Sequence, residues 1–156
     1  GSAVPTAAML GFRLGRTLPD SGTVSRGVCS RDADGRLTGL VETHGIGFRD
    51  GIIRAADPDG ELPAETPVSM NIWALPLAAI DRLAEQWGAF HATNADSATA
   101  EFLLPEALDD QRAQGRLSIE VVDTDEDWIG ITNREDLEVA RAAFAAMGAS
   151  AGEQRG

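Results

Sequence analysis

Residues 68–90, VSMNIWALPLAAIDRLAEQWGAF, decide the fold class of this chain. In the first half, polar Ser69 and Asn71 alternate with apolar residues, and this period of two predicts a strand with both polar side chains on one face. From Leu77 the apolar period changes to 3.6 residues, which predicts an amphipathic helix. The apolar stripe expected along that helix consists of Leu77, Ile80, Leu83, Trp87 and Phe90. A strand that runs directly into a helix favours an α/β or α+β domain.

The rest of the chain supplies further strands on either side of this switch. We expect strands at residues 7–14, 24–31, 37–42, 52–53, 117–122 and 127–132. Asp32-Ala33-Asp34-Gly35, between the second and third of these strands, is typical of a hairpin turn. Residues 57–67 are rich in Pro, Glu and Asp and predict a polar loop.

Two more helices are expected towards the C-terminus. The first begins around Pro105, which suits the first turn of a helix, and ends at Gly115. The second follows Asn133, a typical N-cap residue, with Glu135 and Asp136 in the first turn, where the helix dipole favours acidic side chains. Its expected buried face consists of Leu137, Ala140, Phe144 and Met147.

Charge and composition exclude several classes of protein. The 156 residues include 25 acidic and 13 basic side chains, a formal net charge of −12, and all 13 basic residues are arginine. Without lysine the chain has neither a Walker-type phosphate loop nor a Schiff-base mechanism, and without tyrosine it has no phenolic acid, base or nucleophile. The acidic excess also argues against nucleic acid or an anionic membrane as a partner, because phosphate groups require a basic surface.

The single cysteine and the short apolar runs indicate where the protein resides. Cys29 lies in a predicted strand, where a buried, inert thiol is favoured, and it cannot form an internal disulfide. No apolar run reaches about 18 residues and no signal-peptide pattern occurs, so we expect a cytoplasmic protein. We interpret Gly1-Ser2 as a cloning scar, residues 3–147 as a single domain and residues 148–156 as a disordered tail.

The main candidate site residues are small or polar side chains in predicted strands. Gly27 lies inside a strand, where a missing side chain indicates either a bulge or the close approach of a ligand. Glu42 ends its strand, where a carboxylate can accept two hydroxyls of a sugar or remain an exposed loop group. The shared face of Ser69 and Asn71 favours a ligand or a buried polar network.

Other polar residues have a structural interpretation beside a functional one. Glu101 precedes the second expected helix and is either a pocket residue or a first-turn dipole residue. Trp128 is either the wall of a pocket or ordinary core. The acidic residues of the run 123–127 either bind a hard cation or form a solvated turn. For His44 and His91 a structural or surface role is favoured, and no cysteine–histidine metal cluster occurs.

Five blocks of sequence, in order, carry a resemblance to a known family. They are residues 13–18 (RLGRTL), 22–29 (GTVSRGVC), 68–73 (VSMNIW), 101–105 (EFLLP) and 128–136 (WIGITNRED). Together they resemble a branch of the sugar-1-phosphate nucleotidyltransferases, which include the sugar-nucleotide pyrophosphorylases. The resemblance extends over residues 7–147 and corresponds to the C-terminal half of the family's domain.

This resemblance implies an α/β fold, the C-terminal portion of a Rossmann-like nucleotidyltransferase domain with a mixed β-sheet flanked by helices. Family members join a nucleoside triphosphate to a sugar 1-phosphate with magnesium and release pyrophosphate. The half that this chain resembles builds the sugar-phosphate side of the pocket, where Glu42 would hold sugar hydroxyls. The substrate-binding residues implied by the resemblance are Gly27, Glu42, Asn71, Glu101, Trp128 and Thr132.

The chain departs from the family pattern where phosphate and metal would bind. It lacks the glycine-rich nucleotide loop with its arginine and lysine, and the magnesium-binding aspartate of the N-terminal half. Thr43 stands where many relatives have a phosphate-binding lysine, and Gly130 where many have a metal-binding aspartate. Because nucleotidyl transfer depends on neutralising phosphate charge, we assign no catalytic or metal-binding residue and expect the chain alone to be inactive. A missing N-terminal half or self-association would complete the site.

Two other functions stay open at this point. The chain could be a non-catalytic binding or assembly module that pairs with itself or with another chain, because half of a doubly wound domain leaves sheet edges and apolar faces uncovered. It could also be an acidic α/β domain that binds a small polyol through Glu42 and Asn71.

Overall fold

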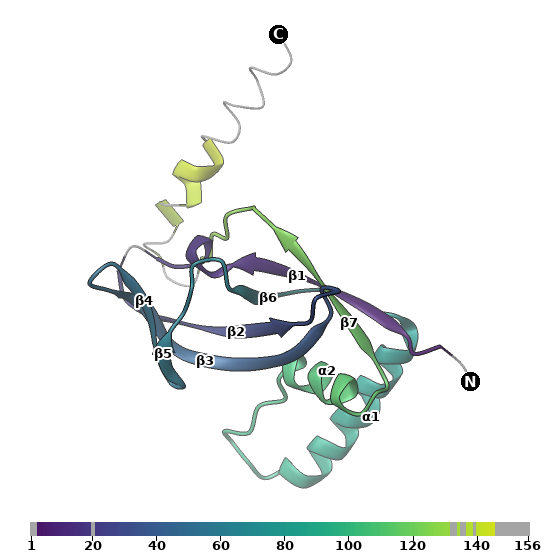
Figure 1. Cartoon of the computed structure of the whole chain (residues 1–156). Coiled ribbons are helices and arrows are strands. Elements are labelled where there is room, and N and C mark those ends of the chain that lie inside the picture. Colours follow the sequence, from purple (N-terminus) through teal and green to yellow (C-terminus); the bar gives the residue numbers. More distant parts are fainter. Residues whose placement is uncertain (1–2, 20, 132–133, 135–136, 139, 146–156) are drawn as a thin grey trace. The chain divides into compact units, whose positions relative to one another are not determined.

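The order of elements in the computed structural model follows the expected switch from strands to helices (Figure 1). The structure describes residues 3–19, 21–131, 134, 137–138 and 140–145. The chain divides into two compact units, residues 1–126 and 127–156. The first unit contains all the strands and helices named below, and the second contains helical residues 137–138 and 140–145.

Seven strands of the described chain form one sheet in the order β5-β4-β3-β2-β6-β1-β7. Their bounds are β1 Thr6–Arg13, β2 Val24–Arg31, β3 Leu37–Arg49, β4 Ile52–Ala56, β5 Asp59–Glu61, β6 Pro67–Ala74 and β7 Ser118–Thr124. β1 and β7 pair in parallel, and the other neighbouring strands pair antiparallel. The α/β class and the mixed sheet expected from the sequence are therefore confirmed.

The helices α1 (Leu77–Asn94) and α2 (Leu104–Ala113) pack against one face of this sheet (Figure 1). Pro105 lies in the first turn of α2, and Gly115 follows its end with φ of +68°, as the sequence predicts. A short 3-10 turn, η1 (Leu14–Arg16), follows β1. The buried core between the helices and the sheet consists of Ala7, Met9, Cys29, Leu37, Ala79, Leu108, Leu117, Ile119 and Val121.

The sheet is curved, so that the hairpin turn between β2 and β3 contacts the edge strand β7. Asp32 Oδ1 accepts hydrogen bonds from the backbone N–H groups of Asp34 (3.0 Å) and Arg36 (2.9 Å), and Gly35 has φ of +82°. These features confirm the expected hairpin turn. The carbonyl oxygen of Gly35 also accepts a hydrogen bond from the N–H of Val121 in β7, at 2.9 Å. Because three strands separate β3 from β7 in the sheet, this bond requires strong curvature.

The buried face of α1 differs from the stripe expected from the sequence. Leu77, Ile80 and Trp87 are 78%, 47% and 50% exposed, whereas Ala79 is fully buried. Leu83 packs against the core as expected. The small side chain of Ala79 lets the helix approach the sheet closely, so Leu83 stays on the core while Leu77, Ile80 and Trp87 lie outside it.

Two strands also differ from expectation. β5 forms inside the stretch predicted as a polar loop, because its backbone pairs with β4. The strand predicted at residues 127–132 is wrong over residues 127–131, which form no strand, and Thr132 lies outside the described residues. An apolar run becomes a strand only where a neighbouring edge accepts its backbone hydrogen bonds.

The last helix is described in part. Ala140 is buried as predicted, whereas Phe144 is 65% exposed, so the prediction of a buried Phe144 is wrong. Phe144 fits the helical period of apolar residues, but this period does not show whether another part of the protein covers the residue. Asn133, expected as the N-cap, and Met147 lie outside the described residues.

Cys29 is expected to be unreactive in the folded protein. It is 4% exposed, its Sγ donates to the carbonyl oxygen of Gly27 at 3.5 Å, and burial raises its pKa to about 12. Because the thiolate is the reactive form, an aromatic disulfide reagent at about pH 8 should label the unfolded chain and not the native one. Rapid labelling of the native chain would contradict this burial.

The same pKa predicts how stability depends on pH. The folded state binds the thiol proton more tightly than the unfolded state, whose ordinary pKa is 9.0. The contribution of Cys29 to the free energy of unfolding is therefore fully present below about pH 9 and is lost as the pH rises to about 12. Urea denaturation of the wild type and of Cys29→Ala over this range measures it, and equal pH dependence in both would contradict it.

Candidate functional site

One row of paired residues crosses the centre of the sheet. Gly27 in β2 pairs with Glu42 in β3 on one side and with Ser69 in β6 on the other. Residues directly opposite each other on neighbouring strands project from the same face of a sheet. The side chains of Glu42 and Ser69 therefore share a face and are separated by a residue that has no side chain. We name Glu42, Gly27 and Ser69 the polar row.

The polar row lies on the face that carries the helices, next to the end of the core. Cys29 and Leu40 pair two positions further along β2 and β3, and both pack in the core under the helices. The side chains of β3 become more exposed with distance from this pair: Glu42 is half-buried, and His44 is exposed. The helix-covered part of the face is thus apolar, and the part beyond it is polar, with Ser69 buried and exposure within the polar row confined to the β3 side.

A bulge in β6 places Asn71 beside the polar row. The pairs Gly11–Ser69 and Met9–Trp73 enclose three residues in β6 and one in β1. Inside this bulge Asn71 adopts the left-handed conformation, with φ of +60°. Its backbone N–H donates to Ser69 Oγ (3.2 Å), and Trp73 Nε1 donates to its Oδ1 (3.4 Å). Bulges redirect side chains beside active sites, and neither bond uses the two N–H donors of the Asn71 amide.

Gly27 contributes no side chain of its own to the centre of the polar row. Its pairing is regular on both sides, so the alternative of a bulge at this glycine is wrong. A Cβ atom here would lie 3.2 Å from Leu40 Cδ2 and 3.5 Å from Ser69 Cβ. Glycine therefore makes room for the Leu40 side chain, which packs over the backbone between Glu42 and Ser69.

Arg26 and Thr43 are a pair on the opposite face of the same strands. The Arg26 guanidinium donates to Thr17 Oγ1 (3.2 Å) and to the carbonyl oxygen of Thr17 (2.5 Å). Burial lowers the pKa of Arg26, and attraction to the Glu42 carboxylate opposes that shift. Thr43 is buried, and its Oγ1 donates to a backbone carbonyl two residues earlier at 3.1 Å. Neither side chain shares a face with the polar row.

The other residues implied by the resemblance are placed differently. Glu101 lines a hollow of about 330 Å³ beside α1 and α2, together with Phe90 and Phe102. No residue of the polar row lines this hollow. Trp128 belongs to the second compact unit, and Thr132 lies outside the described residues. Of the implied set, Gly27, Glu42 and Asn71 therefore lie on adjoining strands, whereas Glu101 lines a hollow away from them.

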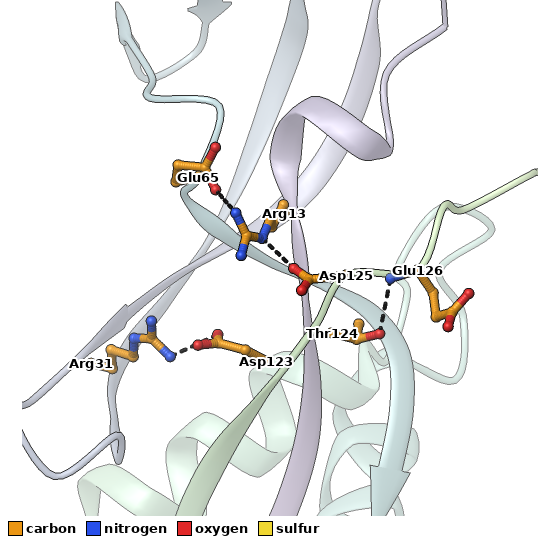
Figure 2. A network of polar contacts seen from close by, with 7 residues as sticks. All are labelled: Arg13, Arg31, Glu65, Asp123, Thr124, Asp125 and Glu126. Carbon is orange, nitrogen blue, oxygen red and sulfur yellow. Dashed lines mark hydrogen bonds and ion pairs between the residues drawn. The ribbon is translucent and has the colours of Figure 1, made fainter.

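Two carboxylates of the acidic run 123–127, which begins at the end of β7, are paired with arginines (Figure 2). Arg31 Nη1 donates to Asp123 Oδ1 at 2.7 Å, and Arg13 Nε lies 2.7 Å from Asp125 Oδ1. Arg13 also forms an ion pair with Glu65, and attraction to Asp125 and to Glu65 raises the pKa of Arg13. Within the described ranges, no three histidine, cysteine or acidic side chains group as metal ligands. The described geometry therefore does not support a hard-cation site in this run.

One polar pair on the face of the polar row was not expected from the sequence. Ser25 Oγ lies 2.8 Å from His44 Nδ1, although the sequence favours a structural or surface role for this histidine. Strand alternation is a signal that could have found the pair. Ser25 precedes Gly27 by two positions and His44 follows Glu42 by two, so all four residues share a face.

Comparisons with known proteins assign no family to this chain. No protein-family model matches it, and no curated protein matches it. Among the residues that the structure describes, no helix is long and apolar enough to cross a membrane. The function is therefore inferred from the polar row and its neighbours.

The left-handed conformation of Asn71 predicts a pattern of stabilities. This conformation costs an ordinary residue about 1–2 kcal/mol and costs glycine almost nothing. We expect Asn71→Ala to lower the free energy of unfolding by about 1 kcal/mol and Asn71→Gly to leave it nearly unchanged, both measured by urea denaturation. Equal destabilisation by the two substitutions would show that the Trp73 hydrogen bond, and not the backbone, selects asparagine.

Proposed function

We propose that this chain supplies the sugar-phosphate-binding side of a nucleotidyltransferase, which joins a nucleoside triphosphate to a sugar 1-phosphate and releases pyrophosphate. The observation that carries the proposal is the polar row with its neighbour Asn71. Gly27, Glu42 and Asn71, three residues implied by the sequence resemblance, lie on adjoining strands of one sheet. The proposal includes a Rossmann-like domain of which this chain forms the C-terminal portion.

The groups in and beside the polar row suit the hydroxyls of a monosaccharide. The two oxygens of the Glu42 carboxylate can accept hydrogen bonds from adjacent hydroxyls. The Asn71 amide can donate to a further sugar oxygen while its own oxygen accepts from Trp73. Strand pairing fixes the backbone of Glu42, and the hydrogen-bonded bulge holds Asn71, so less conformational entropy is lost on binding than from a mobile loop.

The described residues offer no equivalent site for the triphosphate. Nucleotidyl transfer needs cationic groups and, in the resembled family, magnesium to offset the phosphate charge. Asp123 and Asp125 are each paired with an arginine, and no group of three candidate metal ligands occurs in the described part of the chain. These residues do not fit a complete magnesium site, so we assign no metal ligand here. The nucleotide-binding groups belong to another stretch of polypeptide in this proposal.

Binding of hexose 1-phosphates tests the proposal. Isothermal titration calorimetry would compare glucose, galactose and mannose 1-phosphates on the wild type, on Glu42→Gln and on Glu85→Gln. We expect at least one of them to bind, and Glu42→Gln to weaken it about tenfold, because a hydrogen bond to a charged group contributes about 1.5–3 kcal/mol. Glu85, an exposed carboxylate of α1, is the matched control and should have no effect. Binding by none of the three sugars, or equal effects of the two substitutions, would refute the proposal.

The proposal also predicts that the chain alone catalyses no nucleotidyl transfer. With magnesium, each common nucleoside triphosphate and the tightest-binding sugar 1-phosphate, pyrophosphate release should not exceed that of a buffer control. The reason is that a chain without lysine or a phosphate loop cannot neutralise the triphosphate unaided. Turnover by the purified chain would contradict the placement of the cationic groups elsewhere.

A second candidate is a non-catalytic binding or assembly module, and exposed apolar side chains favour it. Leu77 and Trp87 are exposed on α1, and Val41 and Val122 are exposed on the sheet. Interaction surfaces expose apolar side chains of this kind. Such surfaces suit pairing with a second copy or with another chain.

Self-pairing predicts a molar mass that depends on concentration. We expect light scattering after size-exclusion chromatography to show the mass rising towards that of a dimer from low to high micromolar protein. Trp87→Gln should shift this equilibrium towards the monomer because it removes a large exposed apolar side chain. The exposed Glu85→Gln is again a control from the same helix. A constant monomer mass would exclude self-pairing.

A further inference from the structure

The pair Ser25–His44 lies on the face of the polar row, outside the helix-covered core. Ser25 Oγ is 2.8 Å from His44 Nδ1, and both residues are exposed. Strand alternation places the pair on the same face as Gly27 and Glu42. Two positions along a strand span about 7 Å, so His44 is displaced from Glu42 by a distance comparable to one monosaccharide ring.

The backbone holds His44 in place on its other side. Its N–H donates to the carbonyl oxygen of Asp57 (2.7 Å), and the N–H of Asp57 donates to its carbonyl oxygen (3.2 Å). The next residue, Gly45, has φ of +64°, and a Cβ atom there would lie 2.6 Å from Ala56 Cβ. The pairing register of β2 and β3 shifts at this point, as a bulge requires. Backbone pairing and the Ser25 hydroxyl therefore position the imidazole together.

The hydrogen bond to Ser25 occupies Nδ1 of His44 and leaves Nε2 to face a ligand. A serine hydroxyl can donate or accept. When it donates to Nδ1, the neutral ring carries its proton on Nε2, and when the ring is protonated both nitrogens carry protons. In both states Nε2 is a donor. An anionic ligand favours these states over the neutral tautomer that carries its proton on Nδ1.

We propose that His44, oriented by Ser25, binds the phosphate group of a sugar phosphate. The hydroxyls of the same sugar donate hydrogen bonds to Glu42. This inference rests on the proposed sugar-phosphate function. A phosphate is repelled by the Glu42 carboxylate, so it needs a donor on the same face but displaced from Glu42. His44 meets this requirement, whereas Arg26 and Thr43 project from the opposite face. His44 is then a binding residue that selects phosphorylated over neutral sugars, and Ser25 is a positioning residue.

A matched pair of sugars tests the role of His44. Calorimetry would measure the Kd of the tightest-binding hexose 1-phosphate (glucose, galactose or mannose) and of the corresponding neutral methyl glycoside. We expect His44→Ala to weaken the phosphorylated sugar about tenfold or more and to leave the neutral glycoside nearly unchanged. Glu42→Gln should weaken both sugars. His91→Ala, which changes the other histidine of the chain, is the matched control and should affect neither.

A spectroscopic measurement separates the positioning role of Ser25 from a merely structural one. Long-range proton–nitrogen NMR spectra report the protonation of each imidazole nitrogen. Adding the sugar phosphate should shift the Nε2 signal of His44 and leave that of His91 unchanged. Ser25→Ala should weaken binding of the phosphorylated sugar several-fold, and Ser25→Thr, which keeps the hydroxyl, should restore it. Circular dichroism checks that each variant folds.

The outcomes distinguish this inference from the proposed function. If Glu42→Gln weakens both sugars and His44→Ala weakens neither, the inference is overturned and the proposed function stands. If His44→Ala weakens both sugars equally, His44 does not contact the phosphate and the inference is again overturned. If no hexose 1-phosphate binds the wild type, both fail. Should His44→Ala not fold, an unchanged His44 Nε2 signal in the wild type at saturating sugar phosphate overturns the inference.

Discussion

The register of β2 against its two neighbours is the constraint on which the rest of the structure depends. Gly27 opposes Glu42 and Ser69 at once, and side chains alternate between faces with a period of two. A slip of β2 by one residue would turn Gly27 to the opposite face and bring Arg26 or Val28 into its place. Left-handed residues at Asn71 and Gly45 bend the neighbouring strands on either side of the row. These bulges pin the register, because a slip would disrupt both.

This register lets one face of the sheet be both core and candidate site. Under the helices the face carries apolar side chains such as Cys29, and beyond them it carries Glu42 and His44. Charge is divided in a similar way. Arg13 pairs with carboxylates near β7, and the Arg26 guanidinium is held by Thr17 on the opposite face. Arginines that neutralise or cap other groups are not available to a ligand on the polar row, and for this reason we propose His44 as its phosphate-binding group.

Part of the candidate site could be predicted from the sequence because strand alternation is a local property. Gly27 and Glu42 lie on strands joined by a tight turn, and the length and type of such a turn determine which residues pair. The bulge at Asn71 could not be predicted, because it depends on pairing with β1, which is distant in sequence. The resemblance groups Glu101 with the others, whereas the packing of α1 and α2 places it in a hollow away from the polar row. The sequence shows His44 as an isolated histidine, and its contact with Ser25 becomes clear only when β2 and β3 are paired.

The sequence by itself determined the elements whose signals act within a few residues. The change of period at Leu77, Pro105 at the start of α2 and the Asp32–Gly35 turn are of this kind, since each depends on local backbone geometry and hydrogen bonds. Only the tertiary structure decided which face of α1 is buried, that β5 forms, and that residues 127–131 form no strand. The physical reason is that burial and strand pairing require partners from distant parts of the chain. The polar row belongs to both levels, because alternation selects its residues and long-range pairing assembles them.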